Sequence, residues 1–331
     1  MTKSSTGRIT SVITLTIATV FAGMLGPMQS LVNGRLGSEL QDGHAAALVS
    51  FGTGLLLMLV LVLSRERTRH AFIQLPNQLV RGDIPRWNFF AGLCGAVIVL
   101  SEGVTVGFLG VAIFQTSLIS GMVISGIVCD RLGIGVPFKQ VMSAPRVAGA
   151  ILAICATLLV VSPNWSAPHM IALAIMPFVG GLMAGWQPAG NSEVALLSKS
   201  MLVSITWNFL IGFVALGLVY VIRMLTADVS FALPQVWWMY LGGPLGLLSI
   251  ALMALLVRGL GLLVLGLAST AGQLIGSLLL EVTFPAEGTD LHFVTILGTI
   301  VALIAAGISM VPARNPDAPQ SRASVSEVQH G

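Results

Sequence analysis

The stretch GPMQSLVNG, residues 26–34, places a proline and two amide side chains at the end of an otherwise apolar segment. A proline removes a backbone N–H donor and displaces the carbonyl four residues earlier, so the freed groups need partners in a medium without water. Gln29 and Asn33 are four residues apart, which puts both amides on one helix face if the helix persists. An amide both donates and accepts, so this face either satisfies the kinked backbone and joins neighbouring helices or lines a polar cavity.

The chain around this stretch has the composition of a membrane protein. Of its 331 residues, 55% are hydrophobic and 9% are charged, and the mean hydropathy is +0.93. In soluble domains about a quarter of the residues are charged. A helix needs roughly 20 mainly apolar residues to cross the bilayer core. The sequence therefore predicts an all-α polytopic membrane protein with ten transmembrane helices, near residues 9–31, 44–64, 86–106, 108–129, 145–163, 169–190, 201–222, 236–257, 259–280 and 291–312.

The distribution of basic residues predicts the orientation of these spans. If the N-terminus is cytoplasmic, 14 of the 16 Lys and Arg residues fall on the cytoplasmic side, and only Arg35 and Arg223 fall outside. This is the positive-inside pattern, so both termini are expected in the cytoplasm. Residues 1–8 form a short N-terminal segment, and residues 313–331, rich in Pro and Ser, are expected to be a disordered tail. The net charge of +3 thus requires no nucleic-acid partner.

The chain contains an internal duplication. An offset of 158 residues aligns the opening stretch with AGWQPAGNS, residues 184–192, and pairs Gln29 with Gln187 and Asn33 with Asn191. Matching glycines in Gly-rich helices can arise by chance, but paired amides and acids are harder to obtain that way. Each copy holds five spans, an odd number, so the fold class predicted is two inverted five-helix repeats, residues 9–163 and 169–312. Further pairs, the later ones at an offset of 151, are Phe51/Phe209, Gly54/Gly212, Arg65/Arg223, Gly92/Gly243, Gly95/Gly246, Gly110/Gly261, Gly121/Gly272 and Asp130/Glu281.

Inverted repeats with matching Gly/Pro-interrupted segments are typical of secondary transporters, whose site lies near the bilayer midplane between the repeats. The motifs GxxxxGK[ST], HExxH and GxSxG do not occur in the sequence, so we predict no enzyme activity, no cofactor and no metal site. Without a nucleotide site, uphill transport would be driven by an ion gradient. The amide side chains of the two matched stretches would line the transport cavity.

Glu102 is the leading candidate for ion coupling. It lies within or near the end of the third predicted span, where a buried charge costs several kcal/mol unless it is paired, hydrated or protonated. Its counterpart at an offset of 151 is Met253, so this acid belongs to one half alone. The alternative is an acid at the water boundary, because Gly103 and Gly107 could end the helix early.

The fourth and ninth spans are the more polar spans of their halves, and each ends in an acid, Asp130 or Glu281. Both acids are candidates for ion coupling, although an interfacial acid at a helix end is the alternative. Gln115 in the fourth span and Gln273 in the ninth are candidates to contact substrate. Trp186 adjoins the second amide pair and could stack on a ligand, with a plain packing role as the alternative.

The motifs resemble a known transporter family. GPMQSLVNGRLG followed by AALVSFGTG, GWQPAGN followed by ITWNFLIG, and AGQLIGSLLLE are similar to the drug/metabolite transporter (EamA-like) superfamily and, within it, to the YdcZ-type inner-membrane exporter branch. The resemblance implies alternating-access efflux of a small molecule across the bacterial cytoplasmic membrane. In the branch, the late span of each half carries a GQ...D-type pattern. The second half matches it with Gly272, Gln273 and Glu281, whereas the first half has Met122 in place of the glutamine.

The sequence thus favours a secondary transporter, a proton-coupled exporter of a small polar or amphipathic metabolite or drug. Its partners would be that substrate, protons and the lipid bilayer, without nucleic acid, and a homodimer is compatible with the pattern. The alternatives are a passive channel or facilitator of the same fold and a non-transporting membrane scaffold. The expected substrate-binding residues are Gln29, Asn33, Gln187, Asn191, Gln273, Trp186 and Gln115, and the expected ion-coupling residues are Glu102, Glu281 and Asp130.

Overall fold

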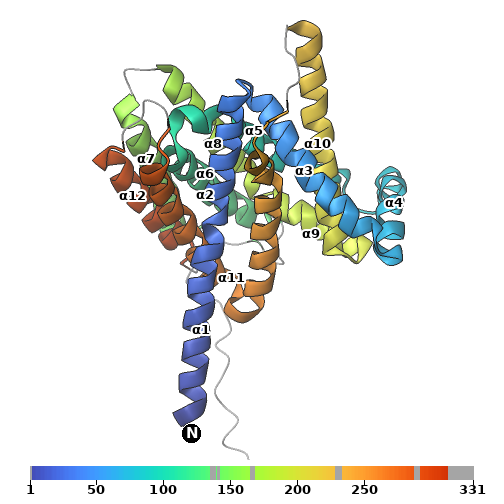
Figure 1. Ribbon diagram of the computed structural model, residues 1–331. Helices are drawn as coiled ribbons and strands as arrows, with labels where there is room; N and C mark the ends of the chain where they lie inside the picture. The colour runs from blue at the N-terminus through green and yellow to red at the C-terminus, as the bar shows by residue number, and fades with distance from the viewer. Residues whose placement is uncertain are drawn as a thin grey trace, which may run out of the picture.

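A computed structural model describes residues 2–134, 139, 142–164, 168–227, 233–286 and 291–311. Throughout these ranges the regular secondary structure is helical, which confirms the all-α class for this part of the chain. The predicted tail, 313–331, lies outside the described residues. Figure 1 shows the long helix α1 rising from the N-terminus at the foot of the view into the bundle. The helices are α1 Thr2–Gly23, α2 Leu25–Glu39, α3 Gly43–Leu63, α4 Glu66–Arg81, α5 Gly92–Leu109, α6 Val111–Leu132, α7 Ala144–Val161, α8 Pro168–Ala184, α9 Gln187–Ser198, α10 Met201–Thr226, α11 Gly242–Thr283 and α12 Phe293–Ser309, with short 3-10 helices at Arg86–Phe90, Ser162–Asn164 and Trp237–Leu241.

Many of these helices have the length and composition of membrane spans. Within the described ranges, 9 helical stretches are long and apolar enough to cross a bilayer. The last apolar helix, α12, has 17 residues, about 25 Å at roughly 1.5 Å per residue, which is shorter than a typical bilayer core of about 30 Å. The protein is therefore a multi-pass membrane protein. The 9 stretches are Val12–Glu39, Gly43–Leu63, Arg86–Leu109, Val111–Leu132, Ala144–Val161, Pro168–Ser198, Met201–Thr226, Trp237–Leu256 and Val264–Thr283.

Pro27 begins a helix instead of kinking one. It is the third residue of α2, and the N–H groups of a first turn lack an intrahelical acceptor in any case, so the missing donor costs little. Pro188 is likewise the second residue of α9. The helical stretches continue through these prolines to Glu39 and Ser198, beyond the predicted ends near residues 31 and 190. The amide motifs consequently lie inside these helical stretches.

Helix α11, Gly242–Thr283, folds back on itself. A β-carbon on Gly246 would lie 2.7 Å from Oε1 of Gln29, and one on Gly276 would lie 3.0 Å from Cγ of Met24. In a straight helix these two glycines would be about 45 Å apart at roughly 1.5 Å per residue. Because Met24 and Gln29 lie close together along the first span, α11 must reverse between the two glycines. Its arms belong to the candidate spans Trp237–Leu256, which also includes the preceding 3-10 helix, and Val264–Thr283.

Glycines allow close and reciprocal contacts between the two matched parts of the chain. Gly54 of α3 packs against the ring of Phe209 in α10, and Gly212 of α10 packs against the ring of Phe51 in α3. The two rings meet with centroids 5.1 Å apart. The same exchange holds for a second pair of glycines. Gly92 of α5 packs against the backbone of Asn208 in α10, and Gly243 of α11 packs against the backbone of Ser50 in α3. Every one of these contacts recurs with the two parts of the chain exchanged.

Arg223, one of the two basic residues expected outside, has a local partner. Asp42 caps the start of α3 and accepts hydrogen bonds from the backbone of His44 at 2.9 Å and from Nη1 of Arg223 at 2.6 Å. Burial acts to raise the pKa of Asp42, but the hydrogen bonds from Arg223 and His44 outweigh it and hold the pKa below its ordinary value of 3.8. The ion pair joins α10 to the start of α3.

Candidate functional site

A buried carboxylate is the centre of the largest polar cluster among the candidate residues. Glu102 is 3% exposed and lies inside α5, which continues to Leu109, so the alternative in which the helix ends early at Gly103 or Gly107 does not hold. The amide of Asn33 donates to Glu102 Oε2 at 2.6 Å, and Gln29 donates to the same atom at 3.5 Å. Ser30 donates to Glu102 Oε1 at 2.9 Å. The amide face of α2 therefore points at Glu102, and we call these four residues, with Gln115, the Glu102 cluster.

Glycines of α11 make the space that this face of α2 requires. Gly242 packs directly on the amide of Asn33, and Gly246, one helical turn further along, packs on the amide of Gln29. On the other side, Gly37 of α2 and Gly103 of α5 let the two helix backbones approach closely. A side chain at these positions would displace the amides or separate the helices. The small residues of three helices thus hold the amides against the acid.

The Glu102 cluster also has hydrogen-bond acceptors without a partner. Gln115, from α6, donates to Ser30 Oγ at 2.9 Å and links a further helix to the cluster. The oxygens Asn33 Oδ1 and Gln115 Oε1 are buried and have no hydrogen-bond partner among the described residues. No cationic side chain in the described part of the chain forms an ion pair with Glu102. The cluster therefore presents three donors to the carboxylate and keeps two acceptors free for a further donor.

The second amide pair forms a separate cluster without an acid. Gln187 donates to Asn208 Oδ1 at 3.3 Å, and Asn208 donates to Asn191 Oδ1 at 2.7 Å. Ser204 donates to the backbone oxygen of Asn191 at 2.6 Å. These residues, which we call the Asn208 cluster, connect α9 to α10. Gly95 of α5 packs against Gln187, as Gly246 packs against Gln29.

Helix α5 passes from one cluster to the other. Gly95 touches the Asn208 cluster and Glu102 lies at the centre of the first cluster, about two helical turns or 10 Å further along. Between Gly95 and Glu102, α5 contributes Ala96 and Val99 to an apolar cluster that contains the paired rings of Phe51 and Phe209. The two amide pairs therefore contact different neighbours across an apolar layer.

Other expected site residues lie outside both clusters. Gln273 contacts Ser269 at 3.4 Å and lies beside Gly26. Trp186 stacks on Trp87 with ring centroids 5.8 Å apart, so its ring already has an aromatic partner. Asp130 forms an ion pair with Arg146 at 2.9 Å. Ser30 and Asn208 were missed by the sequence reasoning, although an amide in the middle of the seventh span was a usable signal for Asn208.

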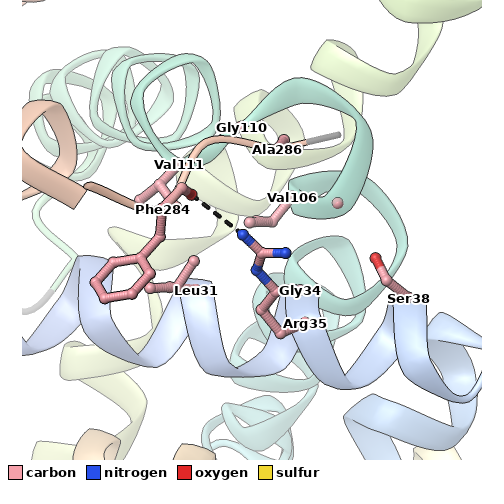
Figure 2. Close-up of a pocket in the computed structure, with 10 residues that line it drawn as sticks. Leu31, Gly34, Arg35, Ser38, Val106, Gly110, Val111, Phe284 and Ala286 are labelled. Atoms are coloured by element: carbon pink, nitrogen blue, oxygen red, sulfur yellow. Dashed lines mark hydrogen bonds between the residues drawn. The ribbon is translucent and has the colours of Figure 1, made fainter. Parts of the chain in front are cut away.

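Glu281 caps the start of α6, directly after the connection from α5. Its Oε2 accepts hydrogen bonds from the backbone N–H groups of Val111 at 2.6 Å and Ala112 at 3.2 Å. Beside it lies a pocket of about 30 Å³, room for about two waters. Figure 2 shows Arg35 of α2 reaching across this pocket toward the chain that follows α11, where it donates to the backbone oxygens of Phe284 and Pro285 at 3.5 and 2.9 Å. The pocket is lined by Leu31, Gly34, Arg35, Ser38, Val106, Gly107, Gly110, Val111, Phe284 and Ala286.

Comparison with protein families identifies the type of protein. The family model described as "Putative inner membrane exporter, YdcZ" matches residues 14–159 and matches the chain again over residues 172–309. The chain belongs to the YdcZ family. No curated protein matches it. One match to the YdcZ model contains the Glu102 cluster and the other contains the Asn208 cluster, so each cluster sits in one copy of the family's unit. Family membership makes this a multi-pass inner-membrane protein of an exporter type and points away from an enzyme.

Proposed function

We propose that the protein is a proton-coupled exporter of a small polar or amphipathic molecule, and that Glu102 takes up and releases the coupling proton. The observation that carries this proposal is a carboxylate 3% exposed, inside a membrane span, that contacts only neutral donors. An ionisable residue at such depth is costly and is found mainly where ions or substrates pass.

The geometry of the Glu102 cluster suits both charge states of the acid. Ionised, Glu102 accepts from Asn33, Ser30 and Gln29. Protonated, it becomes a donor and needs an acceptor. Rotation of the Asn33 amide would offer Oδ1, which has no partner among the described residues. A group that is satisfied in both states can carry a proton without a large penalty in either.

The proposal includes two inverted five-helix halves, with α12 as the tenth span and both termini in the cytoplasm. It is supported by the family model, which matches the chain twice, and by the glycine contacts that recur with the halves exchanged. Alternating access would then be a rocking of the halves about the apolar layer of Phe51 and Phe209. In this arrangement the Glu102 cluster serves the outer half of the pathway and the Asn208 cluster serves the inner half.

The substrate would contact the amides of both clusters in turn. Gln29, Asn33 and Gln115 would bind it near the acid, and Gln187 and Asn191 would bind it on the cytoplasmic side of the apolar layer. Amides recognise polar groups of either donor or acceptor type, which fits a small polar or amphipathic molecule. Gln273 and Trp186 would contribute only after a change of conformation, because both now contact protein neighbours.

The test is transport by purified protein in proteoliposomes, using compounds first selected by thermal stabilisation. Glu102→Gln should reduce proton-gradient-driven transport at least tenfold while substrate exchange without a gradient persists. The matched control is Glu193→Gln, which changes an exposed acid of α9 and should leave transport intact. Undiminished gradient-driven transport in Glu102→Gln would exclude the coupling role. Flux that neither saturates nor shows exchange would instead indicate the passive channel.

A further inference from the structure

Helix α4 lies at the membrane boundary, between two spans. It begins at Glu66, three residues after the span Gly43–Leu63, and ends at Arg81, five residues before the span Arg86–Leu109. A connection of five residues reaches at most about 17 Å. Because both connections are this short, all of α4 stays close to the ends of the two spans. Figure 1 shows α4 at the edge of the bundle, beside the end of α3.

One face of α4 packs on the protein. Leu75 is 0% exposed, and Phe72 and Leu79 pack with it in an apolar cluster that contains Trp207 of α10. The rings of Phe72 and Trp207 meet edge to face, with centroids 6.2 Å apart. The next residue along α10 is Asn208, which holds the Asn208 cluster together. The packed face therefore joins α4 to α10 beside the Asn208 cluster.

The opposite face of α4 combines exposed apolar side chains with arginines. Ile73 and Val80 are seven residues apart, so they lie on one side of the helix, and they are 61% and 74% exposed. Arg67, Arg69 and Arg81 are exposed as well. Among the residues that the structure describes, no acid forms an ion pair with any of the three arginines. We call these five residues the exposed face of α4.

We propose that the exposed face of α4 is a binding surface for anionic lipids. The positive-inside pattern accounts for arginines at this boundary but not for the apolar side chains among them. A helix that carries both groups at the membrane boundary can bury its apolar side chains between the lipid headgroups while its cations bind the phosphates. A guanidinium binds phosphate with two parallel hydrogen bonds. Lipids with a net negative charge would supply the counter-charge that the protein does not provide.

The inference goes beyond the proposed function, because it concerns a surface away from both amide clusters and requires neither substrate nor protons. Lipid bound to the exposed face would hold the packed face in place. Phe72 would then stay against Trp207, next to Asn208. The lipid surface would in this way stabilise the end of α10 that carries the Asn208 cluster.

The experiment measures hydrogen exchange of the α4 backbone amides in the full-length protein, reconstituted in lipid nanodiscs. One sample contains phosphatidylcholine alone, and the other contains an equal mixture of phosphatidylcholine and phosphatidylglycerol. An arginine near an anionic surface favours binding by about fivefold. The mixture should therefore slow exchange in α4 at least tenfold, whereas the amides of α12 should exchange equally in both samples. Equal exchange of α4 in the two lipids would overturn the proposal.

Charge variants show whether the arginines of α4 are responsible. The combined variant Arg67→Gln, Arg69→Gln and Arg81→Gln should abolish the slowing, and high salt should weaken it in the unmodified protein. The substituted side chains are exposed, and glutamine is a good helix former, so the variant should fold. An equal loss in the control would attribute the effect to total charge and refute a site on α4. The control removes the same charge elsewhere on the predicted cytoplasmic side, through Arg131→Gln, Lys139→Gln and Lys199→Gln.

The apolar variant separates a lipid surface from a site for free phosphate. Ile73→Gln with Val80→Gln keeps every arginine and should reduce the slowing at least threefold, because the side chains no longer enter the lipid. Inorganic phosphate added to phosphatidylcholine nanodiscs should leave exchange unchanged. Slowing by phosphate alone, or a full lipid effect in the apolar variant, would identify a small-anion site and refute the lipid surface.

Failure of the proposed function would look different. Both leaflets of a nanodisc have the same composition, so the exchange result does not depend on which side the termini occupy. Undiminished transport by Glu102→Gln would remove proton coupling and leave the lipid surface of α4 untouched. Equal exchange in the two lipids would remove the lipid surface and leave proton coupling untouched.

Discussion

The strength of the hydrogen bond between Asn33 and Glu102 should reveal whether the acid is charged in the resting protein. Asn33 is 0% exposed and donates at 2.6 Å to a carboxylate that no described cation neutralises. Asn33→Ala removes that donor. The comparison variant is Asn191→Ala, the matching residue of the second half, which accepts from the neutral amide of Asn208 at 2.7 Å.

The magnitudes follow from the charge of each acceptor. A hydrogen bond to a charged group contributes about 1.5–3 kcal/mol, and one between neutral groups contributes about 0.5–1.5 kcal/mol. Asn33→Ala should therefore destabilise the protein by roughly 1 kcal/mol more than Asn191→Ala does. In a protein that already carries Glu102→Gln, the same Asn33→Ala change should lower the stability only by the contribution of a hydrogen bond between neutral groups, about 0.5–1.5 kcal/mol. The coupling energy of the double-mutant cycle should then be about 1–1.5 kcal/mol, because cavity effects cancel in the cycle.

The assay is reversible unfolding in mixed detergent micelles at neutral pH, followed by tryptophan fluorescence. Both single variants, the double variant and the unmodified protein are compared at one protein concentration. A coupling energy below about 0.5 kcal/mol, within the usual error of additivity, would show that Glu102 is already neutral when Asn33 binds it. That result would refute the reasoning for an ionised resting carboxylate.

Two further predictions concern the glycine packing and the ion pair between Asp42 and Arg223. Gly54→Ala would push a β-carbon into the ring of Phe209 and should destabilise by about 1–3 kcal/mol, measured by thermal unfolding in detergent. Gly126→Ala, where the added carbon meets nothing within 4 Å, should be neutral or slightly stabilising, and a cost equal to that of Gly54→Ala would contradict the packing argument. Because the pKa of Asp42 is lowered in the folded state, its stabilising contribution is complete above 3.8 and is lost as the pH falls through the folded-state value. Arg223→Met should therefore reduce this acid-induced loss of stability, and an unchanged profile between pH 5 and 2 would show that the pair contributes nothing.

Much of the architecture could be predicted from local sequence features. Long apolar runs predicted a multi-pass helical membrane protein, because each span must satisfy its own backbone in lipid. The offsets of 158 and 151 matched residues that later proved to make reciprocal contacts, such as Gly54 with Phe209 and Gly212 with Phe51. The boundaries were less accurate. Pro27 was expected to disturb a helix, whereas a proline in a first turn loses no hydrogen bond.

The site was only partly predictable. Gln29, Asn33, Gln115 and Glu102 were each chosen from the sequence, but nothing local indicated that they share one cluster. The sequence also paired Asp130 with Glu281 as equivalent acids. In the folded chain one binds Arg146 and the other caps α6, because the partner of each acid is set by the helices that pack against it.

The sequence by itself determined that this chain spans a membrane and that it contains an internal repeat. It also determined that each copy of the repeat carries a proline and two amides within an apolar segment. These properties depend on composition, residue spacing and repetition, which can be recognised in the sequence without knowing which residues are in contact. Only the tertiary structure decided that the break GPMQSLVNG faces Glu102, that AGWQPAGNS faces Asn208, and that an apolar layer separates them. The choice among many polar partners is made by helix packing, because glycines such as Gly242 and Gly95 set which amide comes within hydrogen-bonding distance of which neighbour.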